Sequence, residues 1–188
     1  MSDVALAGVV RALDGFEAVL AGVAPDHWDA PSPCADWSAT DVAGHVIGNL
    51  RATEAIARGR YGEGDALDPG SAAGDEPLTA WRTARADMMA ALNPAALAQL
   101  VPGPWGQMPL GETLERSAME FLVHTWDLAQ ATGQATVVAP DLVRDALGPA
   151  RQFAPLARLS GMIGPECAVP EDADDLTRLL AIFGRRQP

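Results

Sequence analysis

The sequence predicts an all-α protein, an up-and-down bundle of four principal helices followed by extra short C-terminal helices. Several segments carry apolar residues at the three-to-four-residue spacing of an amphipathic helix. No stretch shows strand-type alternation over any length. The connections between the predicted helices are mostly short, which favours antiparallel neighbours. The 188 residues suit a single domain spanning 1–188, large enough to bury a stable core.

Composition narrows the class of protein. A hydrophobic content of 48% predicts a globular chain, and no apolar run is long enough to cross a bilayer. The first residues lack the basic and apolar regions of a signal peptide, so we expect a cytoplasmic protein without a membrane partner. Thirteen basic residues, all arginine, face 25 acidic ones, and a net charge of −12 argues against nucleic-acid binding. Cys34 and Cys167 form no CxxC motif and are expected to be free thiols.

The first half of the chain contains two predicted helices. The first covers about 4–22, and a loop with three prolines and two tryptophans follows to Trp37. Ser38-Ala-Thr-Asp41 has the form of a capping box and begins the second helix, which should end near Gly59. Gly44 lies inside this helix, where it either permits a close approach by another segment or is a tolerated defect.

The second half contains the remaining helices and three kinds of connection. An amphipathic helix is predicted from Glu76 to Leu92, after an acidic surface loop over 62–77. Residues 94–111 could form at most a small hairpin. A continuous helix without proline then leads from Ser117 to Gly133, a typical C-terminal glycine. Two more helices are expected: one opened by Pro140, which Gly148-Pro149 would break or kink, and a short one over 174–183.

The helix that ends at Gly133 carries the candidate chemistry. Glu120, His124 and Asp127 are spaced four and three residues apart, so they share one helix face. A carboxylate and an imidazole one turn apart can bind one divalent metal ion. His45 has apolar neighbours on the second helix, and an antiparallel packing would bring it opposite Glu120 and His124 as a third donor with an open coordination position. The alternative is a core histidine hydrogen-bonded to Glu120 without any metal.

Other residues admit a functional and a structural interpretation. Cys34 could be a fourth ligand or redox partner, although a packed free thiol is the simpler interpretation. His27 is expected in a loop or surface role, and Arg185-Arg186 as a solvated tail. Candidates for the mouth of a pocket are Trp37, Trp105 and Trp126, the last more simply a core residue. Candidates to bind substrate carboxylates are Arg51, Arg58, Arg60, Arg82, Arg85 and Arg116.

Two motifs resemble those of a known superfamily. Pro33-Cys-Ala-Asp-Trp-Ser-Ala-Thr-Asp-Val-Ala-Gly-His45 is similar to the segment that opens the first ligand helix in the DinB-like, mycothiol-dependent maleylpyruvate isomerase N-terminal superfamily. Glu120-Phe-Leu-Val-His-Thr-Trp-Asp-Leu-Ala-Gln-Ala-Thr-Gly133 resembles its second metal motif. The tail Arg178-Leu-Leu-Ala-Ile-Phe-Gly-Arg185 is similar to the ending of a single-domain actinobacterial metal-binding subfamily. The resemblance covers nearly the whole chain.

The resemblance implies a DinB-type four-helix bundle that binds a divalent metal, most often zinc, with nickel, manganese or iron as alternatives. The ligands would be His45, Glu120 and His124, and Asp127 would orient a ligand from behind. Thiol-dependent members use the metal to lower the pKa of a mycothiol or bacillithiol sulfur, whose thiolate then attacks an electrophile. Maleylpyruvate isomerases carry a further C-terminal domain, so isomerisation of maleylpyruvate itself is not expected of 188 residues.

These observations favour a metal-dependent thiol S-transferase or isomerase-type enzyme. Its partners would be a small electrophilic metabolite and a low-molecular-weight thiol, which the resemblance implies to be mycothiol. The protein would be a monomer or homodimer. A non-catalytic metal-binding protein, such as a sensor or a partner-binding bundle, is a second hypothesis. A third is metal-assisted hydrolysis with Glu120 or Asp127 as the base.

Overall fold

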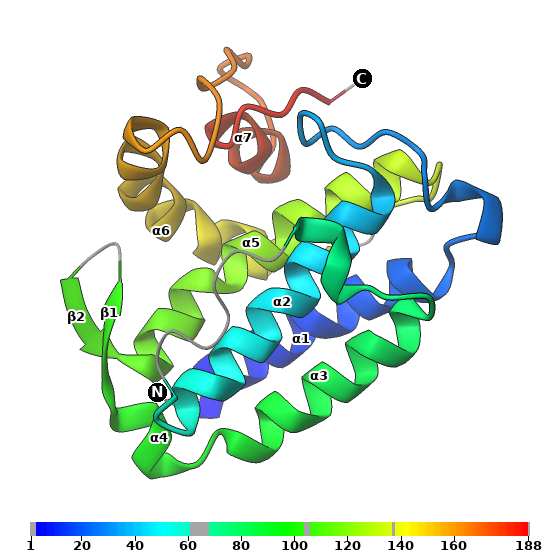
Figure 1. Cartoon of the computed structure of the whole chain (residues 1–188). Coiled ribbons are helices and arrows are strands. Elements are labelled where there is room, and N and C mark those ends of the chain that lie inside the picture. Colours follow the sequence, from blue (N-terminus) through cyan, green and yellow to red (C-terminus); the bar gives the residue numbers. More distant parts are fainter. Residues whose placement is uncertain (1–2, 61–67, 104–105, 137, 188) are drawn as a thin grey trace.

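Long helices lie side by side and form the body of the molecule (Figure 1). The structure is a computed structural model that describes residues 3–60, 68–103, 106–136 and 138–187, with side chains from residue 6. The four helices are α1 (Asp3–Ala21), α2 (Ala39–Ala57), α3 (Pro77–Ala91) and α5 (Leu110–Ala131). Their apolar faces meet in one core, which includes Phe16, Leu50, Trp81 and Leu128. The all-α prediction is confirmed.

The helices do not alternate strictly in direction. The ends of α2 and α3 lie together, because Ile56 and Leu92 pack against the same small cluster of Val101, Leu110 and Leu114. Those two helices therefore run the same way, and α5 starts where they end. The segment that precedes α3 lies back beside the N-terminal half of α2, as the short helix η2 (Pro69–Ala72). This arrangement differs from a simple up-and-down order and follows from the connection after α2, which is long enough to return along the bundle.

Glycine at position 44 permits that return. A Cβ atom on Gly44 would overlap the carbonyl oxygen of Pro69 and lie 2.9 Å from Gly70 Cα. The close-approach interpretation of this glycine is therefore the correct one. The capping box is confirmed as well: Asp41 N donates to Ser38 Oγ over 3.2 Å, and Ser38 N donates to Asp41 Oδ2 over 2.8 Å.

The C-terminal helices differ from the expectation in length. Helix α6 (Pro140–Leu159) is as long as the bundle helices. It continues without a break through Pro149, where a break or kink was expected, and through Pro155. A proline inside a helix removes one hydrogen bond, and α6 retains a buried face, including Ala150 and Phe153, that holds it against the core. Only α7 (Asp175–Ile182) is short. Both lie together at one side of the bundle (Figure 1).

A small hairpin precedes α5, as the sequence allowed. Helix α4 (Pro94–Ala98) leads into strands β1 (Leu100–Gly103) and β2 (Gly106–Pro109), which pair antiparallel. Helix α5 then begins at Leu110, ahead of the predicted Ser117, because the residues between them continue the helical apolar pattern with Leu114 buried. Among the described helices, none has the length and apolar character needed to cross a bilayer.

Candidate functional site

The three predicted donors meet where α2 packs against α5. His45 comes from the first half of α2, and Glu120 and His124 come from successive turns of α5. The imidazole rings of His45 and His124 face each other edge to plane, with centroids 4.9 Å apart. His124 is buried, while His45 and Glu120 are partly buried. The packing of the two helices thus brings together residues that are 75 to 79 positions apart in the sequence.

Asn49 joins two of these donors. Its amide nitrogen Nδ2 lies 3.2 Å from His45 Nε2 and donates to Glu120 Oε2 over 3.3 Å. An amide nitrogen can only donate, so His45 Nε2 accepts and the proton of that ring belongs on Nδ1. One point in the site therefore lies within hydrogen-bonding distance of a ring nitrogen lone pair and a carboxylate oxygen. Asn49 follows His45 by one helical turn on the same face of α2. This four-residue spacing could have predicted the contact from the sequence.

Asp127 contacts the Nδ1 atom of the His124 ring. Its Oδ2 atom lies 3.0 Å from His124 Nδ1, and its side chain is fully buried. Burial alone would raise the pKa of Asp127, but hydrogen bonds from His124 and Arg185 lower it below its usual value. An ionised carboxylate can only accept, so a His124 proton belongs on Nδ1, and in the neutral ring the lone pair is then on Nε2. The same tautomer thus follows for both imidazoles.

The surroundings of His45 keep its imidazole ring neutral. Burial lowers the pKa of His45 to about 3, with further repulsion from His124 and Arg185, so this ring is neutral near pH 7. Burial also raises the pKa of Glu120, which lies close to His124. A neutral imidazole and a carboxylate short of cationic partners are suitable ligands for a divalent cation, because metal binding supplies the missing charge.

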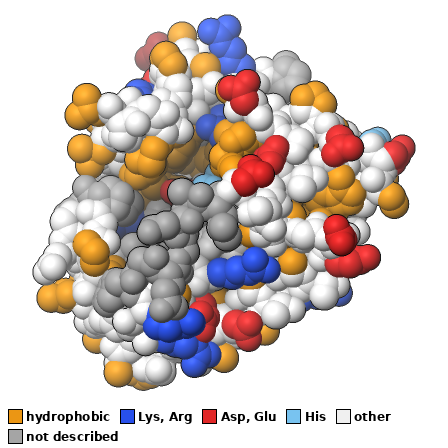
Figure 2. Space-filling model, viewed as in Figure 1, with side chains coloured by type: hydrophobic (Ala, Val, Ile, Leu, Met, Phe, Trp, Pro, Cys, Tyr) orange, Lys and Arg blue, Asp and Glu red, His pale blue; other side chains and the backbone are white. Residues whose placement is uncertain are grey.

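Trp37 forms one wall of the site. Its ring centroid lies 4.9 Å from that of His45 and 6.0 Å from that of His124. Figure 2 shows that the surface is hollowed between α2 and the α6–α7 side, with a histidine and an acidic side chain visible inside. Trp126 is buried in the core, as its simpler interpretation held, whereas Trp105 lies outside the described residues.

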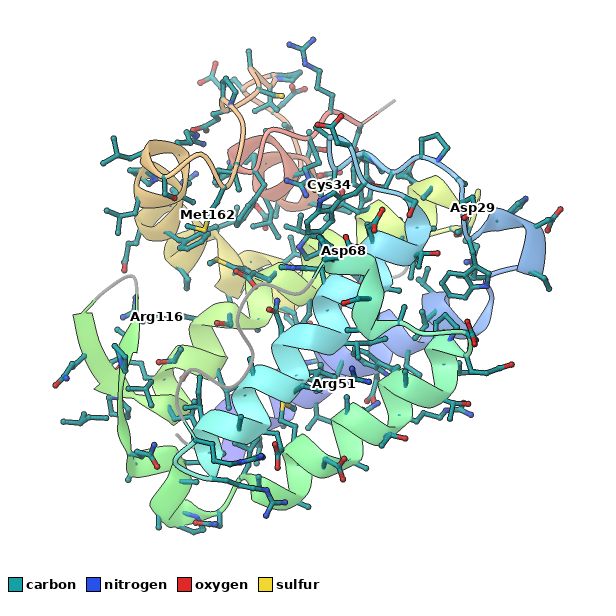
Figure 3. All side chains as sticks on the ribbon, in the orientation of Figure 1. Asp29, Cys34, Arg51, Asp68, Arg116 and Met162 are labelled. Atoms are coloured by element: carbon teal, nitrogen blue, oxygen red, sulfur yellow. The ribbon has the colours of Figure 1, made fainter. Side chains whose placement is uncertain are left out.

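Cys34 lies beside the C-terminal part of the chain, near α7 (Figure 3). Burial raises the pKa of its thiol, and the nearby Arg185 offsets this only in part. Cys34 is therefore a partly buried free thiol with a raised pKa, and its role as a fourth ligand or redox partner stays a prediction. His27 is exposed in the short helix η1 (Pro25–His27), as expected.

Arg185 is the residue that the sequence analysis placed wrongly. It is buried, not solvated, and binds the Asp127 carboxylate with two nitrogens. A basic pair near the end of a chain has the pattern of a surface tail, and only the fold brings it to Asp127. Most other arginines proposed for a substrate carboxylate already bind protein acids: Arg58 and Arg60 bind Glu54, Arg82 and Arg85 bind Glu17, and Arg116 binds Glu112.

The three side chains are of chemical types that bind a divalent metal ion. Two imidazole nitrogens and one carboxylate, with a further position open, form a ligand set typical of catalytic zinc. Within the described ranges, no group of three or more His, Cys, Asp and Glu side chains is placed so that it could hold a metal ion as it stands. Binding would require His45, Glu120 and His124 to close in on a common point, with the Asn49 amide moving aside.

Comparison with known proteins identifies the relatives of this site. Residues 9–129, which include all three donors, match the family model of the mycothiol maleylpyruvate isomerase N-terminal domain. The chain belongs to this family. The match ends within α5, so α6 and α7 lie outside it.

Individual relatives agree with that assignment. An uncharacterised protein of Mycobacterium tuberculosis, found in strains CDC 1551 / Oshkosh and ATCC 25618 / H37Rv, is 32% identical over 190 aligned positions, which cover 93% of this chain and 94% of the relative. The crystal structure of a histidine-to-alanine mutant of mycothiol-dependent maleylpyruvate isomerase superposes with a TM-score of 0.58 at 16% identity. That similarity covers 78% of this chain and 66% of the isomerase chain, and it supports the fold alone.

Proposed function

We propose that this protein is a metal-dependent enzyme that uses a low-molecular-weight thiol, mycothiol, to attack a small electrophilic metabolite in an S-transfer or isomerisation reaction. The observation that carries the proposal is the meeting of His45, Glu120 and His124 where α2 packs against α5. In this family, a thiol-dependent isomerase shares the fold. The proposal thus joins the family's chemistry to donors that this chain brings together.

In this proposal the residues have separate roles. His45 and His124 would each offer Nε2, and Glu120 would offer a carboxylate oxygen. A bound divalent metal, most simply zinc, would act as a Lewis acid and lower the pKa of a coordinated thiol. Asp127 would fix the orientation of the His124 ring, and Trp37 would exclude water from one side of the site.

A second candidate is metal-assisted hydrolysis with Glu120 as the base. The raised pKa of the Glu120 carboxyl group favours it, because a general base works best with a pKa near the operating pH. Asp127 is unsuited to that role, since it is fully buried and held by both His124 and Arg185. A sensor or other non-catalytic metal protein would use the same ligands without turnover.

The first experiment measures metal content in the purified chain by plasma mass spectrometry. We expect about one divalent metal per chain in the wild type and in His27→Ala, whose histidine is exposed and lies in η1, outside α2 and α5. His45→Ala and His124→Ala should lose the metal. A wild type that takes up no zinc, nickel, manganese or iron would contradict the metal site and the enzyme that depends on it.

The second experiment separates the three functions. The metal-loaded protein is incubated with a bimane or chlorodinitrobenzene electrophile, with and without mycothiol. Loss of the electrophile that requires both the thiol and His124 supports the thiol enzyme. Hydrolysis of an ester probe without thiol would instead indicate a hydrolase. Stoichiometric metal without either reaction would favour the non-catalytic alternative.

A further inference from the structure

The C-terminal segment completes the site through Arg185. We propose that Arg185 is a positioning residue, which holds the Asp127 carboxylate so that Asp127 fixes the tautomer and orientation of the His124 ring. The structural part of this inference stands by itself, whereas its value for metal binding rests on the proposed function. Arg185 lies outside residues 9–129, the part of the chain that matches the family model.

The contact between Arg185 and Asp127 has the form of a two-point clamp. Arg185 Nε donates to Asp127 Oδ1 over 3.1 Å, and Nη2 donates to Oδ2 over 2.8 Å. The side chains are 8% and 0% exposed, so water competes little for either partner. A guanidinium that binds both oxygens fixes the plane of the carboxylate as well as its position. The Oδ2 atom that faces His124 Nδ1 is therefore held in place.

The backbone at the end of α7 aims Arg185 toward this contact. Gly184 has a φ of +78°, and two hydrogen bonds run back along the helix: Gly184 N to Ala181 O over 3.0 Å, and Arg185 N to Leu180 O over 2.9 Å. This is the Schellman pattern, which ends a helix and reverses the chain. Arg185 Nη1 also donates to Phe183 O over 2.8 Å, which restrains the guanidinium from the other side.

Anchoring α7 does not by itself require Arg185. Arg158 on α6 already donates to Ile182 O and pairs with Glu166. Arg158 thus ties the same part of the chain to the bundle without touching Asp127. The two arginines offer a matched comparison: both hold the C-terminal segment, but only Arg185 reaches the histidine through a carboxylate.

The test follows the His124 tautomer in metal-free protein by nitrogen NMR of the imidazole ring, with the signals assigned by their loss in His124→Gln. In the wild type we expect a proton on Nδ1 and a lone pair on Nε2. In Arg185→Gln the two nitrogen shifts should move toward an average of both tautomers. In Arg185→Lys they should also move, but less, because one ammonium group can hold one carboxylate oxygen but not both. Arg158→Gln should leave the wild-type shifts unchanged.

An unchanged tautomer in folded Arg185→Gln would overturn the inference. If that variant does not fold, Arg185→Lys decides, and unchanged shifts there have the same meaning. A shift in Arg158→Gln equal to that in Arg185→Gln would show that the effect comes from general loosening of α7.

Zinc titration by calorimetry tests the consequence for the metal. Zinc should bind about tenfold more weakly to Arg185→Gln than to the wild type, as is common when the support of a ligand is removed. Arg158→Gln should bind like the wild type. If the wild type binds none of zinc, nickel, manganese and iron, the proposed function fails, while the NMR result still decides the role of Arg185.

Discussion

The Trp37 indole lies against the His45 imidazole, with ring centroids 4.9 Å apart and planes inclined by 52°. The loop before α2 supplies the tryptophan, and the capping box at Ser38 fixes where that loop meets the helix. Any change at His45 therefore occurs within contact distance of an intrinsic fluorophore. The metal binding proposed above can be followed from this pair without a label.

We expect zinc to change the emission of Trp37, because coordination withdraws electron density from an imidazole ring in contact with the indole. The change should be lost in Trp37→Phe, while the other tryptophans still emit. A zinc titration of the wild type and Trp37→Phe by fluorescence measures it. An equal response in both proteins would mean that the metal binds elsewhere.

Replacement of Asn49 by aspartate should make the protein depend on metal. The change removes the donor shared by His45 and Glu120 and places a second carboxylate next to Glu120. In the metal-free state, we expect a loss of about 1–3 kcal/mol, or roughly 3–9 °C in Tm. Zinc should restore more of this loss in Asn49→Asp than in Asn49→Ala, which lacks the added ligand. Thermal unfolding with EDTA and with zinc makes the comparison, and equal zinc responses in the two variants would contradict the expected metal position.

Two glycines of α2 should respond to alanine in opposite ways. At Gly44 the new Cβ would overlap Pro69 and crowd Gly70, so Gly44→Ala should cost about 1–3 kcal/mol, or roughly 3–9 °C in Tm. At Gly48 no atom lies within 4 Å of the added Cβ, and alanine should stabilise the helix by about 0.5–1 kcal/mol. Thermal unfolding of both variants checks the pair. A stable Gly44→Ala protein would show that η2 can move away from α2 at little cost.

Part of the stability that the protein loses on acidification below pH 5 should come from Glu17. Burial raises the pKa of this carboxyl group, but hydrogen bonds from Arg82, Trp81 and Arg85 outweigh it, and the pKa falls below its ordinary 4.5. A lowered pKa in the folded state gives stability that is complete above the unfolded-state pKa and is lost as the pH falls through the folded-state value. Glu17→Gln should therefore be less stable than the wild type by about 1 kcal/mol at pH 7, with a difference that shrinks toward pH 3.

Urea unfolding at several pH values measures that difference. Asp26→Asn, which removes an exposed acid in η1, serves as the control and should follow the wild type at each pH. A difference between Glu17→Gln and the wild type that stays constant from pH 7 to pH 3 would contradict the role of the charge.

The sequence predicts those parts of the structure that depend on residues close together in the chain. Helical spacing predicts the four bundle helices, and the capping box predicts the start of α2, because both depend on residues within a few turns. The donors on α5 were found because Glu120 and His124 lie on one helix face. His45 could be added only by assuming how α2 and α5 pack.

The features that sequence missed depend on distant parts of the chain. Residues Asp127 and Arg185 are 58 positions apart, and no local pattern distinguishes a buried arginine near α7 from a solvated one. The parallel course of α2 and α3 likewise depends on the fit of η2 against Gly44. Helix α6 continues through two prolines because the bundle supports its buried face, a tertiary effect that outweighs the local preference.

The position of Arg185 also orders events during synthesis. A ribosome adds roughly 5–20 residues per second and releases the chain from its N-terminus onward. The bundle helices α1 to α5 therefore emerge before the residue that clamps Asp127, and an early chain can bring its histidines together without fixing the His124 ring. The His124 ring is therefore fixed only after α7 has docked, and under the proposed function the affinity for metal would rise at that step.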